Sequence, residues 1–327
     1  MSFYEFFSNY PVLNDASAFS KKTVQTIREE LDDALSDSSF KDKITIITTG
    51  SYGRGEASEA SDLDFFVFFD SGLPDDVITS DIIKAKEVIE RHVTKAVGST
   101  GTFGADAIVK FSDLLQNIGG EKDKNQSLTR RILFLLEGTW LYGEDRALYY
   151  REELLKRYIK DIDLEKQISR FLLNDIIRYY RTITTDFEHK VTEDQKSWGL
   201  RNIKLRFSRK LLYFGGIISI AEISDIDRHS KITELCKILD DAILKRIYQV
   251  GPDNQHTARI FEIYQTFLDT ISNQKNRELL DSVTKENRNN CSLFIEMRDL
   301  SKQFSLTLEE WLDAQYQSHP IHHALLF

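Results

Sequence analysis

The segment ITIITTGSYGRGEASEASDLDFFVFF, residues 44–69, decides the fold of the first half of the chain. Residues 44–49 are apolar and β-branched, which is typical of a buried strand, and LDFFVFF at residues 63–69 predicts a second strand. The glycine-rich residues 50–55 between them predict a tight turn, and the residues that follow Gly50-Ser51 are expected to start a helix.

On either side of this segment, residues 24–35 and residues 82–97 show the apolar spacing of a helix. The sequence ADAIVKF at residues 105–111 predicts a third strand. A polar, glycine-containing loop at residues 117–127 then leads into a helix that we expect at residues 130–141. This order of short elements predicts a small mixed β-sheet with helices.

Beyond about residue 150 the strand patterns fade and long helical patterns dominate. We therefore expect an α+β protein, with a sheet-containing domain at residues 1–150 and a mostly helical domain at residues 151–327 that covers the ligand and shapes the acceptor site.

The composition narrows the classes of function. A hydrophobic content of 41% and a charged content of 29% are typical of a globular protein. There is no apolar run of membrane-spanning length and no signal-like N-terminus, so we expect a cytoplasmic protein without membrane partners. Cys236 and Cys291 lie far apart, which argues against a disulfide framework. The net charge of −9 makes a nucleic-acid partner less favoured, although residues 195–210 are locally basic.

Two carboxylates stand at the predicted start of the second strand. If Asp62, Leu63 and Asp64 alternate as in a strand, both acids point to one side, about 6–7 Å apart along the backbone. Like charges at that spacing repel, and a divalent cation such as Mg²⁺ or Mn²⁺ would neutralise them. Gly50 and Ser51 end the first strand, where glycine lets backbone amides approach a phosphate. The pattern predicts one site for metal and phosphate.

Gly50, Ser51, Asp62 and Asp64 together resemble the signature of the DNA polymerase β nucleotidyltransferase superfamily, in which Gly-Ser is followed about ten residues on by Asp-x-Asp. The resemblance implies a third carboxylate on a later strand, and Asp106 is the candidate for this third metal ligand and catalytic base. Asp113 and Asp123 are the nearest alternatives.

Residues 53–56 with Ser61-Asp62 more closely resemble the N-terminal domain of protein-PII uridylyltransferases and related nucleotidyltransferases. Residues 133–145 are similar to a helix of that family, and WGLRNIK at residues 198–204 is similar to its Gly-Gly-Leu-Arg-Asp-Ile segment. Trp198 and Asn202 depart from that segment. Nothing after residue 210 resembles the family's phosphohydrolase region, which implies transfer without the reverse removal.

Further candidates for nucleotide binding are basic. Arg54 either contacts phosphate or locks the turn, and these interpretations stay open. Arg201 and Lys204 lie three residues apart, hence on one helix face, where they could reach a triphosphate or simply be solvated. Residues 178–190 interleave aromatic and basic side chains, which fits either base stacking or a helix core with a charged rim.

The function expected is metal-dependent transfer of an NMP from an NTP to a hydroxyl, with release of pyrophosphate. The closer resemblance implies a protein acceptor, by uridylylation or adenylylation. The alternatives are a small-molecule acceptor of the antibiotic type, a tRNA end, or a non-catalytic nucleotide-binding regulatory or toxin–antitoxin module. The sequence leaves the NTP, the acceptor and the oligomeric state open.

Overall fold

A computed structural model describes residues 1–38, 41–70, 75–93, 108–160, 167–192 and 197–326. Contacts divide the chain into two compact units, each described by itself. The sheet unit is Asp15–Leu164 with Asp227–Ala242, and the helical unit is Met1–Asn14, Glu165–Ile226 and Ile243–Phe327. The domain boundary that we expect near residue 150 stays a prediction.

The sheet unit is built on four strands and the helices that cover them. The strands are β1 (Ile44–Thr49), β2 (Asp64–Phe69), β3 (Ile108–Lys110) and β4 (Thr139–Tyr142). The helices are α2 (Pro11–Ala34), α3 (Gly50–Arg54), α4 (Asp75–His92), α5 (Phe111–Leu115), α6 (Asn125–Glu137), α7 (Glu144–Tyr158) and α11 (Arg228–Asp240), and a 3-10 turn spans Lys41–Lys43.

The strand order is β3-β2-β1-β4. β1 pairs antiparallel with β2 and with β4, whereas β2 pairs in parallel with β3. The predicted α+β class with a small mixed sheet is therefore confirmed, and β1 has the predicted bounds.

Three predicted bounds are wrong. The helix expected at residues 130–141 ends at Glu137, and the chain then enters β4. β2 begins at Asp64, so Asp62 precedes the strand instead of lying in it. The third strand begins at Ile108 among the described residues and ends at Lys110, where Phe111 starts α5. Asp106 lies outside the described residues.

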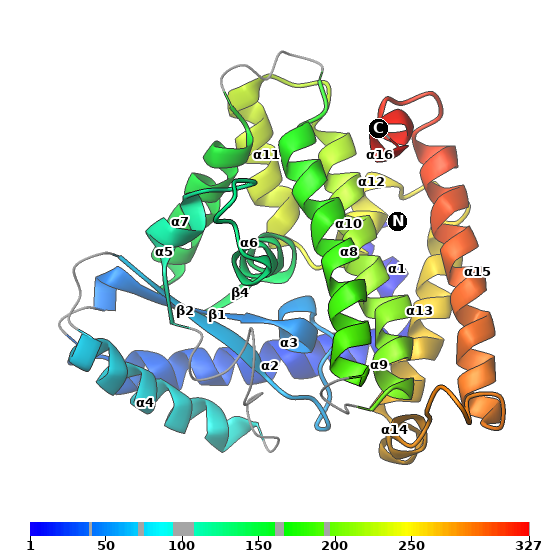
Figure 1. The fold of residues 1–327 in the computed structure, drawn as a ribbon, viewed down its shortest axis with the longest axis horizontal. Helices are drawn as coiled ribbons and strands as arrows, with labels where there is room; N and C mark the ends of the chain where they lie inside the picture. The colour runs from blue at the N-terminus through cyan, green and yellow to red at the C-terminus, as the bar shows by residue number, and fades with distance from the viewer. Residues whose placement is uncertain (39–40, 71–74, 94–107, 161–166, 193–196, 327) are drawn as a thin grey trace. The chain divides into compact units, whose positions relative to one another are not determined.

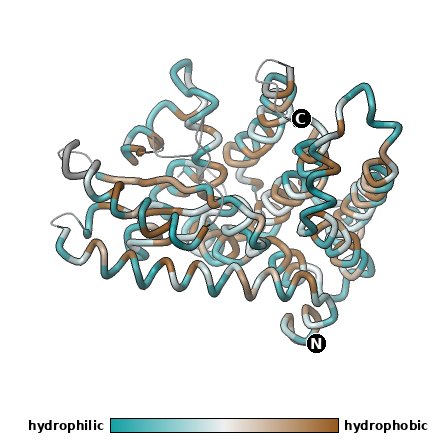
Figure 2. Tube along the Cα trace, turned by 90° about the horizontal axis from the view of Figure 1, so that it is seen from below, coloured by the Kyte–Doolittle hydropathy of each residue, from teal (hydrophilic) through white to brown (hydrophobic). Residues whose placement is uncertain are grey.

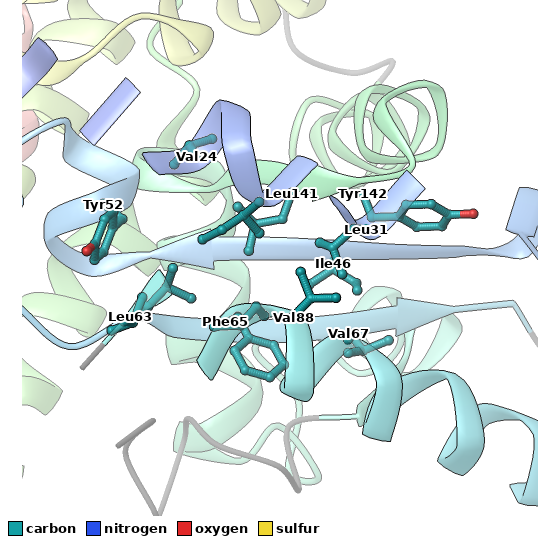
Figure 3. Packing of buried hydrophobic residues seen from close by; sticks show 14 of the residues in the cluster. Val24, Leu31, Ile46, Tyr52, Leu63, Phe65, Val67, Val88, Leu141 and Tyr142 are labelled. Carbon is teal, nitrogen blue, oxygen red and sulfur yellow. The ribbon is translucent and has the colours of Figure 1, made fainter. Parts of the chain in front are cut away.

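Helices cover both faces of the sheet (Figure 1), which explains why β2 reads as a continuous apolar run. On one face Phe65 and Val67 pack with residues of α2 and α4, among them Leu31 and Val88, as Figure 3 shows. On the other face Phe68 meets rings of α5, α6 and α7. These rings are Phe111, Phe134 and Tyr150, at centroid distances of 5.9, 5.0 and 6.3 Å. Because side chains alternate along β2, Phe65 and Val67 pack on the face covered by α2 and α4, whereas Phe68 packs on the face covered by α5, α6 and α7.

Figure 2 shows hydrophilic and hydrophobic residues alternating along α2, which is the pattern of a helix that buries one face. Val24, Ile27 and Leu31 follow helical spacing and are buried, as their sequence pattern predicts.

A buried ion pair ties the loop before α6 to that helix. The Nη1 and Nη2 atoms of Arg131 donate to the two carboxylate oxygens of Asp123 at 2.9 and 2.8 Å, and Nε donates to the Tyr158 hydroxyl at 3.0 Å. The side chains of Arg131 and Asp123 are only 0% and 1% exposed. Asp123 is therefore a structural partner of Arg131.

Replacing Asp123 with Asn is expected to lower the free energy of unfolding by about 3–5 kcal/mol, because it leaves the buried guanidinium without its counter-charge. Urea unfolding followed by circular dichroism measures the change. The control is Asp113→Asn, since Asp113 is exposed and its loss should change stability by less than about 0.5 kcal/mol. Equal effects of the two substitutions would contradict the role given to Asp123.

The helical unit packs long helices around aromatic side chains. Its elements are α1 (Phe3–Phe7), α8 (Arg170–Thr192), α9 (Gly199–Lys204), a π-helical turn (Leu205–Arg209), α10 (Lys210–Glu222), α12 (Ile243–Val250), α13 (Thr257–Ser272), α14 (Gln274–Asp281), α15 (Ser292–Gln315) and α16 (Ile321–Leu326). Phe207 stacks on Phe267 and Phe304 at 4.5 and 5.3 Å in its core. Among the helices described, none combines the length and apolar character that a membrane span requires.

Candidate active site

The glycine-rich turn after β1 is a short helix with a left-handed first residue. Thr49 is extended (φ −134°) and Gly50 has φ +69°, a conformation that favours glycine over residues with a Cβ. A Cβ placed on Gly50 would lie 3.3 Å from Oδ2 of Asp64. The carboxylate of Asp64 therefore points at the turn, and only glycine leaves this approach open.

The chain around Asp64 is held by a hydrogen bond from β1 and by the burial of the preceding residue. The Thr48 hydroxyl donates to the backbone carbonyl of Asp64 at 3.0 Å. Leu63 is fully buried in the same core cluster as Phe65, and Figure 3 shows Leu63 and Tyr52 at one end of that cluster. Asp64 belongs to β2, so the alternation of the strand directs its side chain to the face opposite that of Phe65.

Asp62 is exposed, whereas Asp64 is half-buried. Burial raises the pKa of Tyr52, and the negative charge of Asp62 raises it further. Asp62 thus lies close to the side chain of Tyr52 in the turn, and Asp64 lies against Gly50 in the same turn. The structure brings both acids of the predicted pair to the glycine turn, although only Asp64 belongs to the strand.

Glu137, the last residue of α6, forms hydrogen bonds with two residues of the turn. Its side chain is 0% exposed. Its Oε1 accepts the backbone amide of Gly50 at 3.0 Å, and its Oε2 accepts Nη1 of Arg54 at 2.5 Å. Nε of Arg54 also donates to Glu56 at 2.8 Å. The first amide of the turn therefore already has a partner, and Arg54 joins the two ends of the turn to α6.

A second glycine lets the turn approach the end of α6. A Cβ on Gly53 would lie 2.2 Å from the carbonyl oxygen of Glu137 and 3.2 Å from that of Thr48. The Thr139 hydroxyl donates to the Gly53 carbonyl at 3.3 Å. Any larger residue at this position would push the turn away from Glu137, so Gly53 and Glu137 together determine where the turn sits.

Oxygen donors suited to Mg²⁺ or Mn²⁺ gather at this place. They are the carboxylates of Asp62 and Asp64 and the hydroxyl of Thr49, which is buried and has no hydrogen-bond partner among the described residues. Within the described part of the chain, no group of three or more His, Cys, Asp or Glu could hold a metal ion. A third carboxylate would have to come from elsewhere, and Asp106 lies outside the described residues.

The two alternatives to Asp106, Asp113 and Asp123, differ in exposure and in the residues that they contact. Asp113 is an exposed residue of α5. Asp123 is bound to Arg131.

The two basic candidates for nucleotide binding, Arg201 and Lys204, lie on α9 in the helical unit, Arg201 exposed and Lys204 half-buried. Their contact with a triphosphate stays a prediction.

Comparison with known proteins agrees with the geometry of the turn and the strand that carries Asp64. Residues 24–131 match the family model described as a nucleotidyltransferase domain. This segment is a nucleotidyltransferase domain of the DNA polymerase β type. It contains α2 from Val24 onward, the turn, β2 and β3. Among curated proteins, none matches the chain, and the finer resemblance to protein-PII uridylyltransferases stays a prediction.

Sequence reasoning missed Glu137, which lies six residues beyond the end of the matched domain. The sequence does contain a signal. Glu137 is the single acid in ILFLLEGTWLY, and an acid inside an apolar run is buried only if it has partners. Its partners, Gly50 and Arg54, are more than eighty residues away in the sequence, so the pairing could not be read from the local pattern.

Proposed function

We propose that the chain transfers a nucleoside monophosphate from an NTP to a hydroxyl acceptor in a metal-dependent reaction that releases pyrophosphate. The observation that carries this proposal is the approach of Asp64 to Gly50, where a Cβ would lie 3.3 Å from the carboxylate. It joins a carboxylate suited to a metal ion with a turn open to phosphate, in a domain of the nucleotidyltransferase family.

Asp62 and Asp64 would hold the divalent cations, with Asp106 as the third ligand. The strand after Asp106 supports this third assignment, because β3 pairs in parallel with β2, with Ile108 opposite Val67. Parallel neighbours begin at the same edge of a sheet. When bound, such cations neutralise the triphosphate and favour ionisation of the acceptor hydroxyl.

The remaining roles fall to the chain's own residues. The acceptor oxygen forms a bond to the α-phosphorus while the bond from that phosphorus to the pyrophosphate oxygen breaks. Asp106 takes the proton of the acceptor hydroxyl. The amide and hydroxyl of Ser51 contact the β- and γ-phosphates. The amide of Gly50 is already bound to Glu137, so Gly50 contributes only the space left by its missing Cβ. Arg201 and Lys204 would contribute positive charge.

We propose a protein hydroxyl as the acceptor, in keeping with the resemblance of residues 53–62 to protein-modifying nucleotidyltransferases. Small-molecule and tRNA acceptors are tested as the alternatives. A cationic small molecule is the second choice because the net charge is −9.

The test is an NTP panel with Mg²⁺ or Mn²⁺, each NTP labelled at the α- or the γ-phosphate, with cell extract as the source of acceptors. We expect α-label to enter an acceptor while γ-label leaves as pyrophosphate. Fractionation into protein, RNA and small molecules then identifies the acceptor class. Transfer of γ-label, or nucleotide binding without any release of pyrophosphate, would refute nucleotidyl transfer.

A further inference from the structure

Three cationic side chains lie near one another in the helical unit, at the π-helical turn. Arg206 lies in the turn and Lys210 begins α10, while Arg298 lies on α15. Burial lowers the pKa of Arg206, and the charge of Arg298 lowers it further. Burial also lowers the pKa of Lys210, with a further contribution from Arg206. Lys210 donates to the hydroxyl of Ser305, two helical turns beyond Arg298 on α15.

The cation cluster, defined as Arg206, Lys210 and Arg298, is not neutralised by the protein. Within the described residues, neither Arg206 nor Lys210 forms an ion pair with an acid, and Nε of Arg206 donates to the neutral amide of Asn202 at 2.6 Å. Arg298 lies 3.5 Å from Asp299, an exposed residue that also pairs with Lys302 at 2.8 Å. Half-buried like charges without counter-charges destabilise a fold, so binding of an anion here would be favourable.

The backbone and the neighbouring rings support a ligand site. A π-helical turn is rare and occurs frequently at functional sites. Tyr180 of α8 and Tyr213 of α10 stack beside it at 4.5 Å with an interplanar angle of 10°. Burial raises the pKa of Tyr180, and the charge of Arg206 opposes that rise, so this stacked pair lies next to the cluster.

We propose that Arg206, Lys210 and Arg298 form a binding site for the phosphoryl group of a small molecule. A phosphoryl dianion is attracted by the three neighbouring cations, and the planar fork of an arginine can bind two of its oxygens. The terminal nitrogens of Arg206 make no hydrogen bond within the described residues, because its bond to Asn202 uses Nε. This inference does not depend on nucleotidyl transfer.

Substituting Asn202 with Asp tests the site by adding a carboxylate beside Arg206 in place of an amide of the same shape. We expect Asn202→Asp to raise the melting temperature of the full chain without ligand, since it neutralises one cation. We also expect inorganic phosphate, at constant ionic strength, to raise the melting temperature of the wild type with the logarithm of its concentration. Asn202→Asp and Arg206→Gln should weaken phosphate binding about tenfold or more.

The control is Lys275→Gln, which removes an exposed cation from α14 of the same unit and should respond to phosphate like the wild type. Two results would overturn the proposal. One is a wild type that responds to phosphate no more than to chloride. The other is a phosphate response that Asn202→Asp and Arg206→Gln leave unchanged, which would assign the anion to another place such as the Ser51 turn.

Competition separates the possible sources of the phosphoryl group. AMP, ATP and a sugar phosphate should each displace phosphate measured by calorimetry. If the tyrosine pair adds base stacking, nucleotides will bind at least about fivefold more tightly than the sugar phosphate. Equal affinities would instead assign the site to phosphate esters in general. Failure of all three to displace phosphate would refute a site for phosphorylated small molecules.

Discussion

Asp64→Asn is expected to reduce nucleotidyl transfer by about a thousandfold or more, because it removes one of the three negative charges that would hold the divalent cations. The substitution keeps the size of the side chain. Gly50, whose missing Cβ leaves the approach to Asp64 open, is unchanged, so the turn should keep its shape. Pyrophosphate release and entry of α-label measure the loss, and circular dichroism verifies that the fold is retained.

The control for Asp64→Asn is Asp113→Asn, which removes an exposed carboxylate from α5, close to β3 in the sequence. Its activity should stay within about twofold of the wild type. The same comparison tests the third ligand, because Asp106→Asn should behave like Asp64→Asn if Asp106 is the catalytic base. Full activity of Asp64→Asn, or a loss in Asp113→Asn as large as that in Asp106→Asn, would contradict the assignment.

Glu137→Ala is expected to lower the free energy of unfolding by about 3–5 kcal/mol, since it removes a buried carboxylate that contacts a guanidinium. Arg54 loses one of the two carboxylates that it contacts, and the amide of Gly50 loses its acceptor. Transfer activity should fall as well, because Gly50 and Ser51 are no longer held in place. Urea unfolding measures the stability, and the KM for the NTP measures the position of the turn.

Glu137→Gln separates the two tasks of this side chain. Gln retains an oxygen that can accept the Gly50 amide but loses the charge that faces Arg54. We expect it to recover most of the affinity for the NTP while remaining less stable than the wild type. If Glu137→Gln and Glu137→Ala raise KM equally, Glu137 does not position the turn through Gly50.

The sequence predicts the parts of the site that depend on local pattern. β1 and the glycine turn follow from a β-branched run that ends in Gly50, and the acid pair is visible because it precedes a run of phenylalanines. β2 starts one residue later than predicted, at Asp64, because Leu63 continues the apolar alternation of the strand but lies outside the ladder.

The sequence could not predict the parts that depend on contacts across the chain. β4 is four residues long and follows α6 with only Gly138 between them, so its pairing with β1 decides its conformation. The role of Arg54 likewise depends on a residue that is distant in the sequence, Glu137 at the end of α6. Its interaction with Glu137 favours the turn-locking interpretation over phosphate contact.

Diffraction from crystals grown with Mn²⁺ and a non-hydrolysable NTP would locate both ligands at once. We expect anomalous density for Mn²⁺ at the carboxylates of Asp62 and Asp64, with the β- and γ-phosphates against Ser51. Manganese bound elsewhere, or a triphosphate located away from the turn at Gly50, would contradict the proposed site.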